Sequence, residues 1–150
     1  MSEPQKMVKV GIRDESGQVE TLWATPLGEN TYRLENSPFF AYGISWNDIV
    51  TAELDSEGFP FFIKVIEKSG YKTIRVITEK DSKELPVLLS DINKLGCNYE
   101  GAFSKLIVID IPPEVELRIV SDFMSQTNFE WEFADPTPEQ VNAENNNDES

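Results

Sequence analysis

The chain of 150 residues contains no histidine, and its one cysteine is Cys97. The lack of histidine excludes Ser-His-Asp triads, Cys-His pairs and histidine-ligated metal sites. A single cysteine excludes an internal disulfide framework and fits a reducing compartment. The longest apolar runs, such as LIVIDI at 106–111, are too short to cross a bilayer, and the first ten residues lack the apolar stretch of a secretory signal. We therefore expect a cytoplasmic protein.

Motifs for phosphate and calcium are also missing. The glycines form neither a GxGxxG nor a Walker pattern, and the turns DESGQVE (14–20) and DSEGFP (55–60) do not match a calcium loop. Cys97 follows Gly96 at an expected helix exit, where the negative end of the helix dipole raises a thiol pKa, so we expect a core residue rather than a nucleophile. The sequence predicts no metal site, no cofactor and no catalytic residue.

Basic residues are scarce. Lys and Arg together number 13 against 27 Asp and Glu, which gives a net charge of −14. After Arg118 there are eight acidic residues and no basic one, whereas the first 118 residues hold 27 − 8 = 19 acids against 13 bases. Such a field repels nucleic acid and anionic membrane and speeds the encounter with basic partners. The alternative is that the charge only keeps a small protein soluble.

The first half of the chain reads as short alternating segments separated by turns. With no helical period among them, they predict a small β-barrel or strongly bent sheet. The segment SPFFAYGISW (37–46) interrupts the series, because it is rich in aromatic residues, contains Pro38 and Gly43, and has no clean period. The expected strands span residues 7–13, 18–24, 31–35, 47–54 and 59–68.

The second half predicts the order strand, helix, strand, strand, helix, strand, which is the split βαβ or ferredoxin-like arrangement. In its last strand, NFEWEF, the side chains of Phe129, Trp131 and Phe133 should face the helices. Glu130 and Glu132 should lie on the opposite face, at a sheet edge. The expected elements span residues 71–77, 85–95, 98–103, 105–111, 112–126 and 128–134.

The fold expectation is therefore an α+β protein in three parts. An N-terminal small β-barrel occupies residues 1–69, and a ferredoxin-like antiparallel sheet with two helices occupies residues 70–134. The remainder, 135–150, has no apolar period and should be a disordered acidic tail.

Three sequence boxes carry a family resemblance: YRLENSPFFAYGISWNDIVTAEL (32–54), SGYKTIRVI (69–77) and LGCNYEGAF (95–103). They resemble the bacterial family described as domain of unknown function 4265, over about residues 7–134. The resemblance implies a soluble, cytoplasmic bacterial protein. It carries no activity and no catalytic residues.

The LGCNYEG step is also similar, more faintly, to the ribonuclease E inhibitor B family, whose ferredoxin-like domain has a Gly-x-Tyr-Asp-Gly turn. Glu100 stands where that family has aspartate. The resemblance supplies a precedent, since an acidic ferredoxin-like protein can act by binding and inhibiting an enzyme.

The leading functional expectation is a non-enzymatic acidic interaction protein that binds and inhibits a basic protein partner. The concrete form is a bacterial immunity protein that neutralises a toxin enzyme such as a nuclease; neither nucleic acid nor membrane is an expected partner. Tyr99 and Trp46 would anchor the partner. The acidic steering residues would be Glu100, Glu130, Glu132 and Asp135.

Two alternatives come from other classes. A regulatory small-ligand module would have a pocket at the junction of the two halves, lined by Phe39, Phe40 and Tyr42, although the aromatic segment could equally be a staple between the halves. An acid–base enzyme would need Glu100 and Asp110 to converge in a cleft, with one raised pKa.

Overall fold

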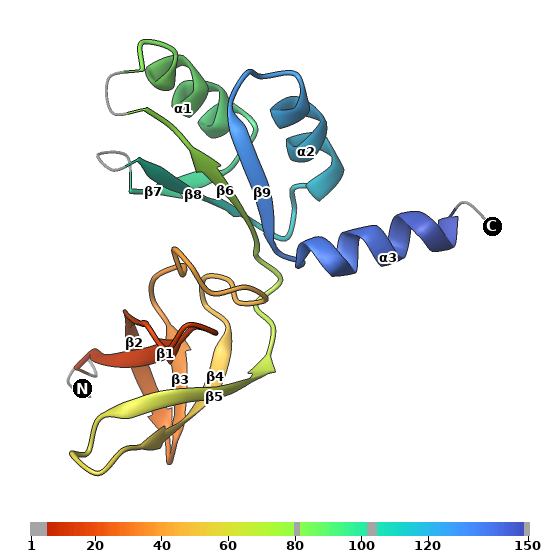
Figure 1. Ribbon diagram of the computed structural model, residues 1–150. Coiled ribbons are helices and arrows are strands. Elements are labelled where there is room, and N and C mark those ends of the chain that lie inside the picture. Colours follow the sequence, from red (N-terminus) through yellow and green to blue (C-terminus); the bar gives the residue numbers. More distant parts are fainter. Residues whose placement is uncertain (1–5, 80–81, 102–104, 149–150) are drawn as a thin grey trace.

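The computed structural model contains a closed β-barrel below a second sheet that carries two helices (Figure 1). The structure describes residues 6–79, 82–101 and 105–148. The closed barrel and the second sheet with its helices confirm the α+β class and the N-terminal barrel that the alternating segments predicted. Within the described part of the chain, no helix is long and apolar enough to span a membrane.

The barrel closes where its first and last strands run parallel, at Gly11 opposite Phe61. A Cβ on Gly11 would lie 2.8 Å from Cε1 of Phe61, so this close approach requires glycine. Alternate residues of the strands point inward and form a small aliphatic core that includes Val10, Leu34 and Val50. The strands are β1 (Val8–Arg13), β2 (Val19–Gly28), β3 (Thr31–Leu34), β4 (Ile49–Leu54) and β5 (Pro60–Glu67).

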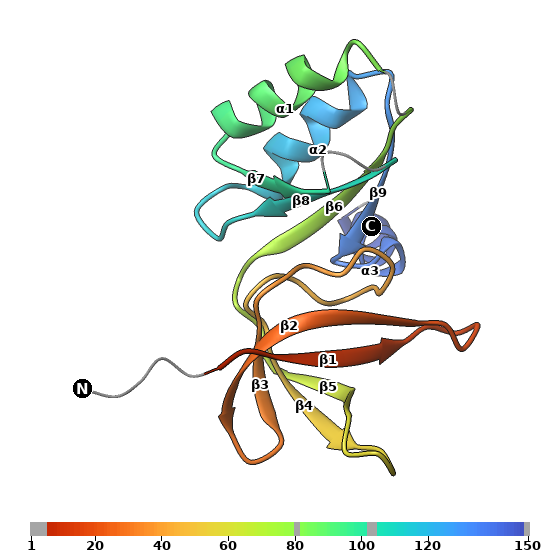
Figure 2. The same ribbon diagram turned by 90° about the vertical axis from the view of Figure 1, so that its left-hand side faces the viewer.

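The second sheet has the strand order β7-β8-β6-β9, with antiparallel neighbours throughout. Its two helices lie on the face turned away from the barrel (Figure 2). Phe129, Trp131 and Phe133 pack against the core on this side, as the alternation predicted, and β9 is an edge strand. The elements are β6 (Lys72–Ile77), α1 (Leu85–Lys94), β7 (Asn98–Glu100), β8 (Leu106–Ile111), α2 (Leu117–Ser125) and β9 (Glu130–Asp135).

Two expected boundaries differ from the structure by four residues or more. Helix α2 begins at Leu117 rather than at 112, because the two prolines form a turn closed by the hydrogen bond from the Val115 amide to the Pro112 carbonyl. Strand β2 runs through residues 26–28, which were expected to be a turn, and a bulge at Pro26 and Gly28 absorbs the irregularity. The end of the predicted strand 98–103, at residues 102 and 103, lies outside the described residues.

The expectation of a disordered tail is wrong for α3 (Pro138–Asp148). The sequence TPEQ forms a reciprocal cap: the Gln140 amide donates to Oγ1 of Thr137 at 3.2 Å, and the Thr137 amide donates to Oε1 of Gln140 at 2.8 Å. This is a capping box with proline at the first helical position. This polar helix lacks apolar periodicity, so its cap is the local signal by which the sequence could have predicted it.

Candidate functional site: the junction and its cleft

The loop of residues 35–48, between β3 and β4, lies between the barrel and the open face of the second sheet (Figure 2). We call this segment the junction loop. The open face is the one opposite the helices, and its central side chains are polar: Thr73 and Arg75 from β6, Asp110 from β8 and Glu132 from β9. Each of them bonds to the junction loop. The open face is therefore an internal docking surface, which answers what lies on the far side of the NFEWEF strand.

The first bonded cluster joins Ser37 to two carboxyl groups of the sheet. The Ser37 hydroxyl donates to Oδ1 of Asp110, and its amide donates to Oε2 of Glu100 at 3.1 Å. Asp110 is 5% exposed and hydrogen-bonded to Glu100. Burial first, then that bond to Glu100, raises the pKa of Asp110 to about 8, so its carboxyl is protonated at neutral pH.

The second cluster fixes the tip of the loop from two sides. The Glu20 carboxylate accepts hydrogen bonds from the amides of Phe39, Phe40 and Ala41, at 2.8 to 3.1 Å. From the other side, the buried Arg75 guanidinium donates to the carbonyls of Phe39 and Ala41. The three amides of the tip and two of its carbonyls are thus bonded to charged groups, which restrains its conformation.

The third cluster joins the end of the loop to β6 and β9. The Ser45 hydroxyl lies 2.6 Å from both Oγ1 of Thr73 and Oδ2 of Asp135. The Lys68 ammonium bridges the carboxylates of Asp48 and Asp135. Because Asp48 is fully buried and Asp135 is 7% exposed, both acids act inside the molecule.

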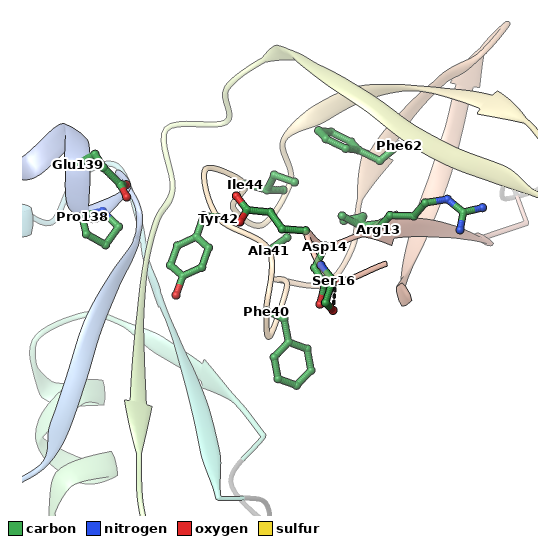
Figure 3. A pocket seen from close by; sticks show the side chains of 12 residues that line it. Arg13, Asp14, Ser16, Phe40, Ala41, Tyr42, Ile44, Phe62, Pro138 and Glu139 are labelled. Atoms are coloured by element: carbon green, nitrogen blue, oxygen red, sulfur yellow. Dashed lines mark hydrogen bonds between the residues drawn. The ribbon is translucent and has the colours of Figure 1, made fainter. Parts of the chain in front are cut away.

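Beside these clusters lies a cleft of about 770 Å³ at the junction (Figure 3). Its walls come from the end of β1 and the following turn, from the junction loop, from β5 and from the start of α3. The lining residues are Ile12, Arg13, Asp14, Glu15, Ser16, Phe40, Ala41, Tyr42, Ile44, Phe62, Pro138 and Glu139.

Two aromatic side chains of the tip project into the cleft. Phe40 is 61% exposed and Tyr42 is 49% exposed. The Tyr42 hydroxyl donates to the carboxylate of Glu132 at 2.8 to 2.9 Å, and the Arg75 guanidinium lies 4.7 Å from the ring centre. Burial first, then the bond to Glu132, raises the pKa of Tyr42, so the hydroxyl stays protonated. Both rings are exposed on a fixed support.

The charge of the cleft is negative. Asp14, Glu15 and Glu139 line it, whereas its one lining cation, Arg13, stacks on Phe61 with its guanidinium carbon 4.1 Å from the ring centre. Hydrogen bonds from Ser16 lower the pKa of Asp14, which keeps it ionised. The sequence did not predict these acids as site residues, because they lie on a turn and at a helix start that are far apart in the chain.

The expected partner-binding acids mostly have internal roles. Glu100, Glu132 and Asp135 bond to the junction loop, and of the four expected steering acids only Glu130 is exposed. Neither expected anchor is free. Tyr99 packs against the helix-side core, while the Trp46 indole donates to the Glu35 carbonyl and stacks edge-on against Tyr71 at 4.8 Å.

Of the three aromatic residues expected to line a pocket, two line the cleft and one packs inside the molecule. Phe40 and Tyr42 line the cleft. The Phe39 ring instead covers Gly101, where a Cβ would lie 2.6 Å from the ring. The aromatic segment is therefore both a staple between the halves and a source of exposed rings.

The Glu100–Asp110 pair meets two of the three conditions for an acid–base enzyme, since the groups converge and one pKa is raised. Ser37 covers the pair, however, and the 5% exposure of Asp110 leaves no room for a substrate in this arrangement. In the parts of the chain that the structure describes, no three Cys, Asp or Glu side chains form a group that could hold a metal.

The protein therefore belongs to the class of two-part α+β folds, and its two halves meet through one hydrogen-bonded loop. The three boxes of the sequence converge at that loop: Phe39 and Ser37 meet Gly101 and Glu100, Arg75 binds the tip, and Trp46 stacks on Tyr71. The chain belongs to the family described as Domain of unknown function (DUF4265), which matches residues 20–133. The matched region contains every residue of the three bonded clusters except Asp135, whereas seven of the twelve residues that line the cleft lie outside it.

A solved structure described as a hypothetical protein from Neisseria gonorrhoeae has a similar fold. It is 19% identical in sequence, with a TM-score of 0.66, and the match covers 89% of this chain and 96% of that one. At this identity the likeness shows the fold alone. No curated protein matches the sequence.

Proposed function

We propose that the chain is a non-enzymatic binding protein that engages and inhibits a basic protein partner. The observation that carries the proposal is the junction cleft, in which two half-exposed aromatic rings on a fixed support stand among carboxylates. Exposed aromatic side chains in a preorganised setting are typical anchors of protein–protein interfaces. The net charge of −14 adds a long-range attraction that favours encounter with a basic surface.

The concrete form of the proposal is an immunity protein that neutralises a toxin enzyme such as a nuclease. An enzyme that binds nucleic acid presents cations in its active site, and an acidic cleft complements them. Because three of the four acids first expected to steer the partner bond internally, the steering role passes to Glu15, Glu139 and Asp14 at the cleft, with Glu130 outside it.

We also propose that residues 70–134 are a ferredoxin-like domain that follows a barrel domain of residues 1–69. The strand order β7-β8-β6-β9, with both helices on one face, supports this arrangement. The faint resemblance of the LGCNYEG step to the ribonuclease E inhibitor B family supports an inhibitory role as a precedent.

The test is capture followed by kinetics. The immobilised chain is exposed to lysate of its source bacterium at low and moderate salt, and any protein retained in stoichiometric amount is purified and assayed for its own activity. We expect a basic enzyme that is inhibited on binding, with an association rate that falls as salt rises. Retention without inhibition would contradict the inhibitory role, and a salt-independent association rate would contradict the electrostatic one.

A second candidate function is a regulatory small-ligand module. The cleft volume of about 770 Å³, with Phe40, Tyr42 and Ile44 in its wall, favours it, since ligand pockets are commonly of this size. A screen of metabolites by ligand-observed NMR distinguishes the two. A ligand that binds in the absence of any basic partner, and shifts the Phe40 and Ile44 signals, would favour the module.

A further inference from the structure

We infer that the junction cleft receives an extended segment of the partner in which an arginine or lysine stands beside an apolar residue. The inference rests on the proposed function and identifies the part of the partner that the cleft binds. The cation would lie between the Tyr42 and Phe40 rings and the carboxylates of Glu15 and Glu139. The apolar neighbour would pack on the exposed part of Phe62, which lines the same cleft.

The tip of the junction loop is preorganised for a contact. An exposed phenylalanine on a flexible loop loses conformational entropy when a partner binds it. Here the tip is bonded by Glu20 on its amide side and by Arg75 on its carbonyl side. The ring of Phe40, 61% exposed, is therefore already placed for a contact before any partner arrives.

The lining of the cleft also selects the charge of the bound segment. Three carboxylates and one guanidinium, that of Arg13, line the cleft, so the net charge of its lining is negative. One face of Tyr42 is taken by Arg75, which leaves the rest of that ring and the exposed part of Phe40 for a second cation. Aromatic faces and carboxylates together favour a guanidinium or ammonium group, and they disfavour an acidic segment.

The cleft also contains apolar surface. Phe62 lines the same cleft and is partly exposed, whereas Ile12 and Ile44, at 4% and 3% exposure, are already buried beneath it, so a cation alone would leave apolar surface of Phe62 in water. An aliphatic neighbour in the segment would remove it from solvent. A short extended peptide carries both groups within the reach of one cleft, since successive side chains of an extended chain point to opposite sides.

The test uses capped pentapeptides as probes and the full chain labelled with ¹⁵N. The first peptide has a central arginine between two leucines, the second has citrulline in place of arginine, and the third has glutamate. We expect the arginine peptide to shift the amide signals of Phe40, Tyr42 and Ile44, the citrulline peptide to bind at least fivefold more weakly, and the glutamate peptide not to bind.

Matched variants separate the two recognition elements. Phe40→Ala should weaken the arginine peptide about tenfold, whereas Val87→Ala, a similarly exposed apolar residue on α1 at 63%, should not change it. Glu15→Gln with Glu139→Gln should weaken it, whereas Glu53→Gln with Glu57→Gln, exposed acids of the β4–β5 hairpin, should have little effect.

Failure of this inference is distinguishable from failure of the proposed function. If a captured basic partner binds and is inhibited, yet the cleft variants bind it normally, the cleft is not the docking site and the inference is overturned. Equal binding of the arginine and citrulline peptides would overturn the cation part. If no basic partner is captured and no peptide binds, both the proposed function and the inference fail.

Discussion

The hydroxyl of Ser37 donates a hydrogen bond to the buried carboxyl of Asp110, which joins the barrel's longest loop to the second sheet across 73 positions of the sequence. The same carboxyl is hydrogen-bonded to Glu100. Two nearby titratable groups, Tyr71 and Cys97, supply no positive charge that would neutralise the pair. Burial first, then the charge of Glu114 and then that of Asp110, raises the pKa of Tyr71. Burial first, then the charge of Asp110, raises the pKa of Cys97 to about 11. The junction therefore holds a proton at neutral pH.

The contribution of Asp110 to the free energy of unfolding should fall as pH rises from about 4 to about 8. The folded-state pKa of about 8 lies above the ordinary aspartate value of 3.8, so in this window the folded state binds more protons than the unfolded state. One whole proton corresponds to about 1.4 kcal/mol per pH unit at most. Urea denaturation at pH 5, 6, 7 and 8 measures the slope.

Asp110→Asn is the control for that slope, because an amide keeps a donor and an acceptor but does not titrate. The difference in unfolding free energy between wild type and variant should shrink or change sign as pH rises. If the two proteins show the same slope from pH 5 to pH 8, the protonated Asp110 has no part in the stability of the junction.

Glu20→Ala should loosen the tip of the junction loop. It removes the acceptor of three amides and should cost about 1–3 kcal/mol. Hydrogen exchange at Phe39, Phe40 and Ala41 should accelerate more than exchange in the barrel core. Glu53→Ala, an exposed acid of β4, serves as the control and should leave those rates unchanged. Unchanged exchange in the Glu20 variant would show that Arg75 alone fixes the tip.

Gly101→Ala should cost more than Gly58→Ala, although the two glycines have nearly the same backbone, with φ of +82° and +83°. A side chain in this region costs about 1–2 kcal/mol at either position. At Gly101 the added Cβ would also meet the Phe39 ring at 2.6 Å and the Leu106 carbonyl at 2.8 Å, whereas Gly58 has open space around it. Overpacking should add about 1–3 kcal/mol. Equal denaturation midpoints would show that Phe39 moves aside freely.

Thr137→Ala should reduce the helicity of α3. The variant loses one half of the capping box, at a cost of about 1 kcal/mol to the helix. Far-UV circular dichroism near 222 nm measures the loss. Asn142→Ala, an exposed position in the same helix, should keep or raise the signal because alanine is the better helix former. A signal that is equally strong in the Thr137 variant would mean that the cap does not hold this helix.

The core and the order of elements could be read from the sequence because they follow local periodicity. Val10 and Ile12 alternate with outward residues in β1, and Phe129, Trp131 and Phe133 do the same at β9, so each side chain's face follows from its position. The predicted start of α2 was wrong because Pro113 is equally compatible with a helix start and with a turn. Local sequence does not decide between the two.

The candidate site could not be read in the same way, because its parts are brought together only by tertiary structure. Glu20 lies 19 residues before Phe39, and the Glu132 carboxylate lies 90 residues after Tyr42. Nothing in the local pattern of Glu132 or Asp135 distinguishes an acid that faces solvent from one that binds a neighbouring loop. The one pair anticipated from the sequence, Glu100 and Asp110, lies on adjacent strands β7 and β8, whose pairing follows from the strand order.

The cleft has walls from the barrel, the junction loop and the start of α3, so it exists only while the two halves are docked. A molecule that fills it binds the docked form and has no complete site on separated halves. Linkage then requires that such a molecule raise the free energy of unfolding by RT ln(1 + [L]/Kd), which is about 2.7 kcal/mol at a hundredfold excess over Kd. Thermal stability can therefore report occupancy of the cleft, even by a partner whose own activity is unknown.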